Sequence, residues 1–351
     1  MPPRTAPTTP LLEAALRTAQ ALGLTAELVE VEPKLGRTQA DALVRLGHGE
    51  NDARLYAVEV KRAMRPVTLG AAIHQIERLG ENALLVADYV TPAMADTLKA
   101  RRIPFIDGAG NAYVEHPGVL IWVKGQKPQA PLVPLTTGRA FQPTGLQVVF
   151  ALLCNPQWIN LPYRELAQHA GVAHGTVGWV VPDLEEQGFT AKLKGKRGTR
   201  RLFHREKLLA QWVDAYARNL RPRLLIGRYY VPTIEDWKKW PVAAHEALWG
   251  EEPAGALLTD HLRPGALTIY AAKLPALLAA RQKFAKAPEF GRTVEVQVRR
   301  RFWNFTEDNE KRAIAPAVLV YADLLATGEG RCLETAKMVY EAHVARLLGT
   351  E

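Results

Sequence analysis

Cysteine is scarce in this sequence. Cys154 and Cys332 are the only two among 351 residues, and they lie far apart along the chain. Their spacing provides neither a disulfide framework nor paired ligands for a structural zinc ion, and it is typical of a protein in a reducing compartment. No stretch of about 18 apolar residues occurs, and residues 1–4 do not begin a secretion signal. We therefore expect a cytoplasmic protein with no membrane partner.

Two common catalytic signatures are missing too. The chain has no Walker-type phosphate loop and no arrangement of Ser, His and Asp that predicts a hydrolase triad. Its content of 48% hydrophobic and 23% charged residues is ordinary for a globular protein. At 351 residues the chain is long enough for two or three domains, each able to bury a core.

Acidic residues are few in one basic segment. Residues 191–230 hold only Glu206 and Asp214 against twelve basic residues, a surplus about as large as the net charge of +9 of the whole chain. Such a concentration favours a polyanionic partner, and we expect double-stranded DNA. The alternative is a surface that is merely solvated. The twelve are Lys192, Lys194, Lys196, Arg197, Arg200, Arg201, Arg205, Lys207, Arg218, Arg221, Arg223 and Arg228.

A hairpin is predicted near the amino terminus. Residues 40–46 and 54–61 alternate between apolar and polar around a turn rich in Gly, Asn and Asp. If the hairpin folds about residue 50, Asp41 lies opposite Glu59, and Lys61 shares the face of Glu59. Two facing carboxylates are a natural site for Mg²⁺ or Mn²⁺, beside which a lysine can position a water molecule. The alternative is an exposed ion pair of Glu59 and Lys61 at a strand end.

The residues Asp41…Glu59-Val60-Lys61 resemble the signature of the PD-(D/E)XK nuclease superfamily, although Ala40 stands where the name expects Pro. Gln75, in an expected helix over residues 69–79, matches relatives that carry Gln there. The resemblance implies a restriction-endonuclease-like mixed sheet flanked by helices. It also implies that Asp41 and Glu59 are metal ligands, that Lys61 is catalytic, and that Gln75 orients the scissile region. Further strands are expected near residues 28–31, 83–87, 103–106 and 119–123, and helices near 11–22 and 91–101.

A proline-rich stretch over residues 127–143 predicts a linker, so the nuclease-like domain would span residues 1–126. Beyond the linker, an apolar helix over residues 145–154 precedes a helix–turn–helix pattern over residues 161–177, with Gly171 in the turn.

Two short strands, residues 190–194 and 199–204, follow this pattern around a Gly-flanked basic turn. This order resembles a winged helix-turn-helix, which implies a DNA-binding domain over residues 144–220. The hairpin would be a wing that contacts phosphates or a minor groove. The alternative is a winged helix that contacts protein.

The second helix of this pattern would present its first turns to base edges, and His174 and Thr176 lie there. Trp179 is either another base contact or a core residue, and Pro182 is expected to kink or split the helix. The expected DNA contacts in and beside the wing are Lys192, Lys194, Lys196, Arg197, Arg200 and Arg201.

A third, α+β domain is expected over residues 221–351, with a helix start near 254–258, strands near 266–270 and 293–298 and helices near 316–325 and 334–348. The motifs Trp249-Gly250-Glu251-Glu252-Pro253 and Tyr321-Ala322-Asp323-Leu324-Leu325 resemble the carboxy-terminal region of AbiEi-like proteins. That resemblance implies a DNA-binding antitoxin or regulator of a mobile element or plasmid, whose candidate partners are a cognate toxin or a second copy of the chain. Asp323, Arg331 and Glu334 are either a functional cluster or a salt-bridged junction between helices.

Two hypotheses follow for a chain of class α/β plus α+β. In the first, a metal-dependent deoxyribonuclease docks on duplex DNA through its winged helix. The set of Asp41, Glu59 and Lys61 favours this hypothesis. In the second, a non-catalytic regulator, antitoxin or plasmid-maintenance protein uses the nuclease-like domain only to hold DNA or a partner. DNA binding is common to both.

Overall fold

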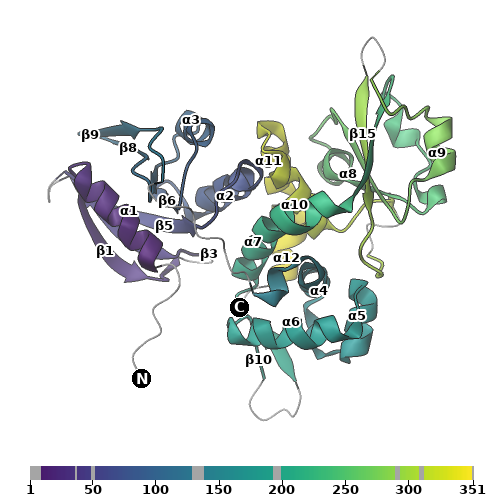
Figure 1. The fold of residues 1–351 in the computed structure, drawn as a ribbon, viewed down its shortest axis with the longest axis horizontal. Coiled ribbons are helices and arrows are strands. Elements are labelled where there is room, and N and C mark those ends of the chain that lie inside the picture. The colour runs from purple at the N-terminus through teal and green to yellow at the C-terminus, as the bar shows by residue number, and fades with distance from the viewer. Residues whose placement is uncertain are drawn as a thin grey trace. The chain divides into compact units, whose positions relative to one another are not determined.

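The computed structural model describes residues 9–35, 38–48, 52–128, 138–192, 199–288, 293–307 and 312–349. The chain forms two compact units, residues 1–136 and 137–351 (Figure 1). The boundary between them falls inside the predicted linker, and the further division of the second unit at residue 220 stays a prediction. Among the described residues, no helix has the length and apolar character needed to cross a membrane.

The first unit is built on one mixed sheet. Its elements are α1 Thr9–Ala21, β1 Thr25–Val31, β2 Lys34–Leu35, β3 Thr38–Gln39, β4 Ala42–Gly47, β5 Arg54–Lys61, α2 Pro66–Leu79, β6 Ala83–Ala87, α3 Pro92–Ala100, β7 Phe105–Asp107, β8 Ala112–His116 and β9 Val119–Val123. The seven-stranded sheet has the order β1-β4-β5-β6-β7-β8-β9, and β2 pairs with β3 separately. Strands run parallel from β5 to β7 and antiparallel elsewhere. The parallel steps need crossover connections, which α2 and α3 supply.

One face of this sheet is covered by α1. Leu12, Ala15 and Ala19 recur at helical spacing on one side of α1 and pack in a cluster with buried residues of β4, β5 and β6, among them Leu84 and Val86. Burying each large aliphatic side chain stabilises the fold by about 1.5–3 kcal/mol. Because strand side chains alternate between faces, the buried residues between these positions point to the opposite face, where α2 packs.

The second unit begins with a group of helices. Its first elements are η1 Arg139–Phe141, α4 Pro143–Cys154, η2 Pro156–Asn160, α5 Tyr163–Ala170, α6 His174–Glu186, β10 Thr190–Lys192, β11 Arg200–Leu202 and α7 Arg205–Ala215. The central helix is α4, whose Phe150 stacks on Trp212 with ring centroids 5.4 Å apart. Phe150 also packs against Phe302, at 5.0 Å, and against Trp303 and Phe305, both at 5.8 Å. The helices therefore share one aromatic core with a segment from the far end of the chain.

The rest of the second unit is a four-stranded sheet with helices. Its elements are η3 Tyr216–Leu220, η4 Arg221–Leu224, β12 Leu225–Val231, η5 Trp237–Lys239, η6 Ala243–His245, β13 Leu248–Gly250, α8 Glu251–Thr259, β14 Leu267–Ala271, α9 Ala276–Arg281, β15 Val294–Arg300, α10 Ala317–Thr327, α11 Gly330–Val339, η8 Tyr340–Val344 and α12 Ala345–Leu348. The strand order is β12-β15-β14-β13, with β14 and β15 parallel.

The two faces of this sheet differ in polarity. Val296 and Val298 are buried on one face, whereas Gln297 and Arg299 alternate with them and point to the other. Thr268 and Tyr270 of β14 lie opposite Gln297 and Arg299, so the second face is polar across two strands.

A mixed α/β architecture with a multistranded mixed sheet is confirmed, and the strand over residues 83–87 has its predicted bounds. The sequence analysis missed β8, β12 and β13, and also the two-residue strands β2 and β3. The strand β13 has only three residues, and β12 is an edge strand with Gly227 and Arg228 in its middle, so neither has a clear apolar alternation. The last long helix begins at Gly330, four residues before its predicted start at Glu334, and passes through a π-helical turn.

Candidate functional site

The turn between α5 and α6 needs a glycine for two reasons. Gly171 has φ of 68°, in the left-handed region that favours glycine. A Cβ at this position would also lie 2.6 Å from the carbonyl oxygen of Phe302. Asn304 braces the same turn, because its backbone N–H donates to the His169 carbonyl at 2.9 Å and its amide donates to the Gln168 carbonyl at 3.1 Å. The turn is therefore fixed by the segment that follows β15.

The second helix of the pair, α6, has one buried and one exposed face. Val177, Val180, Val181 and Leu184 are buried at helical spacing. His174 is exposed and Thr176 is half-buried in the first turn, the position that the sequence analysis proposed for base contacts.

The structure decides between alternatives at two positions of α6. Trp179 is 57% exposed, so of its two interpretations the core residue is wrong. Pro182 does not split the helix, which runs unbroken from His174 to Glu186. Pro182 is exposed, and on the solvent side of a helix the carbonyl group that loses its N–H partner can tilt towards water.

The hairpin β10–β11 follows α6 directly, with Lys192 paired to Arg200 and Ala191 to Arg201. The second strand, Arg200–Leu202, is shorter than the predicted 199–204, and residues 193 and 194 of the predicted first strand lie outside the described residues. Lys192 and Arg201 are exposed, whereas Arg200 is half-buried, with its backbone bonded at 2.7 Å to the Asn160 side chain. Three residues expected to contact DNA lie outside the described residues: Lys194, Lys196 and Arg197.

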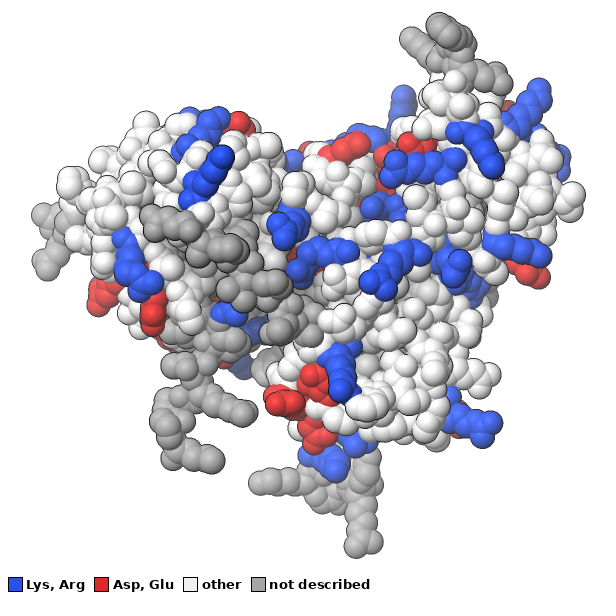
Figure 2. All heavy atoms as spheres, in the orientation of Figure 1, with Lys and Arg blue, Asp and Glu red and all other residues white. Residues whose placement is uncertain are grey.

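The basic residues of the segment 191–230 do not form one surface. Arg205 donates to the Leu347 carbonyl, Arg218 to the Asp214 carbonyl, and Arg221 belongs to a buried network. On the face of the second unit drawn in Figure 2, lysines and arginines outnumber acidic residues but lie scattered. Among the described basic residues of the segment, Lys192 and Arg201 on the hairpin are exposed, and so are Arg223 and Arg228 beyond it.

In the first unit, the predicted hairpin register is confirmed over residues 42–46 and 54–58. Ala42 pairs with Val58 and Leu46 with Arg54, so that partner numbers sum to 100 as expected. At Asp41 this register shifts, because the Asp41 N–H donates to the Val58 carbonyl at 2.9 Å, so the pairing does not continue to the predicted Asp41 and Glu59 pair. The Asp41 carboxylate accepts a hydrogen bond from the Val60 N–H at 2.8 Å.

The other two residues of this motif form an ion pair. Glu59 Oε1 lies 3.0 Å from Lys61 Nζ, and these side chains are only 16% and 10% exposed. The pair is thus largely buried, unlike the exposed strand-end pair of the alternative interpretation. Gln75 lies on α2 as expected, and its Oε1 atom is buried with no hydrogen-bond partner among the described residues.

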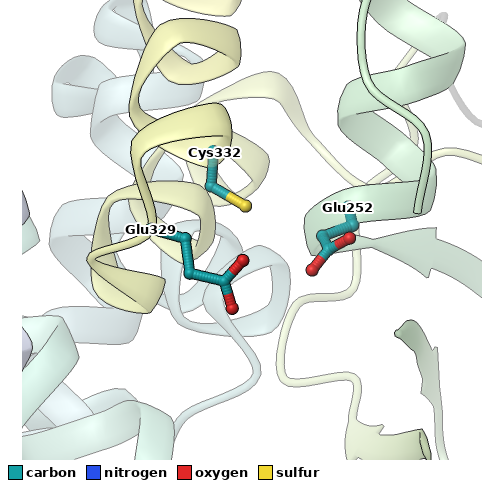
Figure 3. A group of neighbouring side chains, drawn as sticks. All are labelled: Glu252, Glu329 and Cys332. Atoms are coloured by element: carbon teal, nitrogen blue, oxygen red, sulfur yellow. The ribbon is translucent and has the colours of Figure 1, made fainter. Parts of the chain in front are cut away.

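A group of three potential metal ligands occurs elsewhere, in the second unit. Glu252, Glu329 and Cys332 place one ligand atom each within 4.8 Å of one another (Figure 3). Arg331 already pairs with both carboxylates of this group, since its guanidinium donates to both oxygens of Glu252 at 2.7 and 2.8 Å and lies 2.8 Å from Glu329. Burial raises the pKa of the Cys332 thiol to about 11. These contacts explain the group as an ion-paired junction of α8 and α11.

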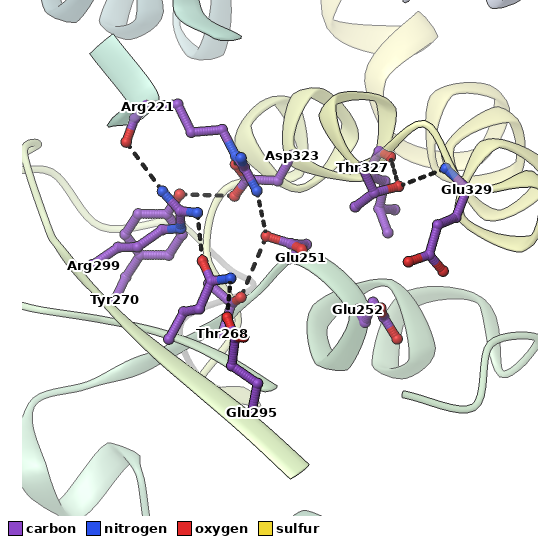
Figure 4. Close-up of polar contacts among 12 residues, drawn as sticks. Arg221, Glu251, Glu252, Thr268, Tyr270, Glu295, Arg299, Asp323, Thr327 and Glu329 are labelled. Carbon is purple, nitrogen blue, oxygen red and sulfur yellow. Dashed lines mark hydrogen bonds and ion pairs between the residues drawn. The ribbon is translucent and has the colours of Figure 1, made fainter. Parts of the chain in front are cut away.

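Beside it lies a buried polar network, drawn in Figure 4. The Asp323 carboxylate is fully buried and accepts hydrogen bonds from the Tyr216 hydroxyl at 2.8 Å and the Tyr270 hydroxyl at 2.7 Å. Arg221 donates to Asp323 at 3.1 Å and to Glu251 at 2.8 Å. Arg299 donates to the Arg221 carbonyl at 3.0 Å. The network ties the segment after α7 to α8, α10 and the sheet.

Burial also sets the protonation of this network. It raises the pKa of Tyr216 and Tyr270 well above the usual range, so both phenols stay protonated as donors to Asp323. Burial raises the pKa of Glu251 as well, although Arg221 opposes the shift. For Arg221, burial alone would lower the pKa, but Glu251 and Asp323 raise it above its usual range.

The proposed cluster of Asp323, Arg331 and Glu334 is not one site. Asp323 belongs to the buried network, and Arg331 binds Glu252 and Glu329. Glu334 is exposed, with its carboxylate 3.7 Å from the His261 ring. The alternative, a salt-bridged junction between helices, describes Arg331. The sequence analysis did not identify Arg221, Glu251 and Tyr270 as one group, although a Glu-Glu pair in apolar surroundings signals buried charge.

Comparison with protein families gives one match. Residues 201–345 match the family described as "Transcriptional regulator, AbiEi antitoxin, Type IV TA system". The match covers less than half of the chain, from β11 to the start of α12, and confirms the resemblance of the carboxy-terminal part. It starts about 20 residues before the predicted boundary at residue 221. Comparison with curated proteins gave no match, and neither did comparison with solved structures. No match supports the nuclease resemblance of residues 1–126.

Proposed function

We propose that this protein is a DNA-binding transcriptional regulator related to the antitoxins of type IV toxin–antitoxin systems. The observation that carries the proposal is the family match over residues 201–345, which begins in the hairpin directly after α6. The matched residues and the helix–turn–helix therefore belong to the same compact unit. This is the second of the two hypotheses drawn from the sequence.

We propose that residues 144–220 act as a winged helix on duplex DNA. The order helix, turn, helix, hairpin supports this, as does the exposure of the first turn of α6 and of Lys192 and Arg201. In this arrangement His174 and Thr176 meet base edges in the major groove, and the hairpin contacts phosphates. Phosphate contacts supply most of the affinity, and the helix supplies the sequence preference.

Selection from a random duplex library tests this proposal. Full-length protein is expected to enrich one shared motif over several rounds, and His174→Ala/Thr176→Ala protein to lose preference at one or two of its base pairs. If the wild type enriches no motif and retains no duplex, the hairpin and α6 serve protein contacts, and the regulator proposal is wrong.

A cognate toxin is the further partner that the family description suggests. We propose that residues 201–345 carry the toxin-antagonising function, with DNA binding supplied by α6 and the hairpin. Co-expression with a candidate growth-arresting toxin tests it. Growth is expected to be rescued by the wild type and by His174→Ala/Thr176→Ala protein alike. Failure of the wild type to rescue growth contradicts the proposal.

A metal-dependent deoxyribonuclease in the first unit is the second candidate function, supported by the hydrogen bond from the Val60 N–H to the Asp41 carboxylate, which brings Asp41 beside the segment of Glu59 and Lys61. The carboxylates of Asp41 and Glu59 would hold Mg²⁺ or Mn²⁺, which lowers the pKa of a bound water molecule. Lys61 would position that water, and Gln75 would orient the scissile region. The fit is partial, because a cation would compete with Lys61 for Glu59 and with the Val60 N–H for Asp41. We therefore rank this function second.

A further inference from the structure

The exposed face of α6 has an unusual composition for a helix surface. Gly175, Gly178, Trp179 and Pro182 are all exposed there, and α6 contains no lysine or arginine. Glycine destabilises a helix interior by about 1 kcal/mol relative to alanine. A Cβ at Gly178 would meet no atom within 4 Å, and one at Gly175 would make only an ordinary contact with Trp179 at 3.8 Å. Packing inside the protein therefore does not require either glycine.

A positive charge reaches this face from another element. The Arg139 guanidinium, from η1, lies over the Trp179 ring with its carbon 3.9 Å from the ring centroid. Asp183 of α6 holds that turn in place, because its carboxylate accepts the Ala140 N–H at 2.7 Å. Gly138 allows this approach, since a Cβ there would lie 2.6 Å from both Asp183 oxygens. Arg139 is exposed, although the sequence analysis placed it in a linker.

Stacking on Trp179 restricts what Arg139 can do. A guanidinium on an aromatic ring keeps a fixed plane and directs its N–H groups outward from the ring edge. This is the geometry with which arginine donates two hydrogen bonds to the O6 and N7 atoms of guanine in the major groove. The same planar fork also fits a phosphate, and the test below separates a guanine contact from a phosphate contact. The side-chain-free surface at Gly175 and Gly178 leaves room for base edges to approach α6 closely.

We propose that Arg139, stacked on Trp179, is a guanine-reading element of the DNA interface, which rests on the proposed function above. Arg139 donates to O6 and N7 of one guanine, and Trp179 is the positioning residue that fixes the guanidinium plane. Duplex DNA is the occupant because the exposed cations Lys192 and Arg201 lie on the hairpin that follows α6 directly.

A chemical double-mutant cycle tests this inference. The full-length protein first selects its preferred duplex, and each guanine in that site is then replaced singly by 7-deazaguanine, which lacks the N7 acceptor. At one guanine, the replacement is expected to weaken wild-type binding by about tenfold to a hundredfold. Arg139→Lys protein keeps the charge but not the planar fork of the guanidinium. It should therefore bind the unmodified site about tenfold to a hundredfold more weakly than the wild type. Replacement of the guanine by 7-deazaguanine should not weaken its binding further. Trp179→Ala should reduce the sensitivity, and Trp179→Phe should restore part of it.

The matched control is Arg164→Ala, which removes an exposed arginine of α5. It should keep the full sensitivity to 7-deazaguanine. If Arg139→Lys retains the wild-type sensitivity at every guanine, or if Arg139→Ala and Arg164→Ala weaken all duplexes equally, then Arg139 is at most a phosphate contact and the inference is wrong. If the wild type selects no duplex, the proposed function itself fails, which is a different result.

Discussion

At the scale of single residues, buried ion pairs and hydrogen bonds fix the position of Arg221 in the second unit. Arg221 bridges Glu251 and Asp323, and its side chain is 16% exposed against 9% and 0% for theirs. Charges removed from water in this way require partners, because each unpaired buried ion costs several kcal/mol. The two tyrosines and Arg221 together satisfy Asp323, so the family-like motif around Tyr321 and Asp323 has a structural role here.

Removing Arg221 should therefore be severe. Arg221→Ala leaves Glu251 and Asp323 buried without their main partner, and we expect the free energy of unfolding of the second unit to fall by about 3–5 kcal/mol. Urea titration followed by tryptophan fluorescence measures it, since every tryptophan but Trp122 lies in residues 137–351. Arg228→Ala is the control, because Arg228 is 61% exposed and pairs with Glu295 at 3.8 Å, so the loss should be about 0–1 kcal/mol. Equal losses in the two variants would show that the network contributes little.

At the scale of elements, the exposed face of α6, where DNA binding is proposed, has residues with low helix propensity. An exposed helix face with two glycines, a proline and a tryptophan is poorly suited to an isolated helix, and such conflicts are expected mainly at functional sites. In the turn before α6, by contrast, the structure itself requires glycine. Gly171 has a left-handed backbone conformation, and a Cβ there would collide with the Phe302 carbonyl.

This contrast gives a prediction for α6. Gly178→Ala should stabilise the protein by about 0.5–1 kcal/mol, because the added methyl group lies in open space and the unfolded chain loses freedom. The same methyl group should weaken binding to the selected duplex. Thermal melting and fluorescence anisotropy measure the two effects. Gly171→Ala, by contrast, should destabilise the protein. If the Gly178→Ala variant binds the selected duplex as tightly as the wild type, the proposed close contact between α6 and DNA is wrong.

The elements that could be predicted from the sequence are those defined by a local pattern of residues. The hairpin register was predictable because alternation and a polar turn both define it, and the helix pair was predictable because helical spacing surrounds Gly171. Arg139 was missed because prolines nearby indicate a linker, and nothing local shows that Asp183 draws η1 against α6. The buried network was missed for the same reason. Arg221 and Asp323 are 102 residues apart, and only tertiary packing brings them together.

At the scale of the whole molecule, the two units carry different candidate functions. If the first unit holds a divalent cation, Mg²⁺ or Mn²⁺ should raise its melting temperature, because the ion binds the folded state preferentially. Glu59→Gln should abolish most of that gain, and Lys61→Ala should keep it. Scanning calorimetry of the full-length protein measures both. A gain that is equal in the wild type and in Glu59→Gln would rule out Asp41 and Glu59 as the metal site.

The central claim is that the second unit binds duplex DNA through α6 and the hairpin. Its most direct test is the salt dependence of binding to one labelled duplex, for the wild type and for Lys192→Ala/Arg201→Ala. Both side chains are exposed on the hairpin, and each phosphate contact contributes about 0.9 to the slope of log K against log salt concentration. The account predicts wild-type binding that weakens steeply with salt, and a slope shallower by about two units in the variant. Absence of binding, or the same slope and affinity in both proteins, would contradict it.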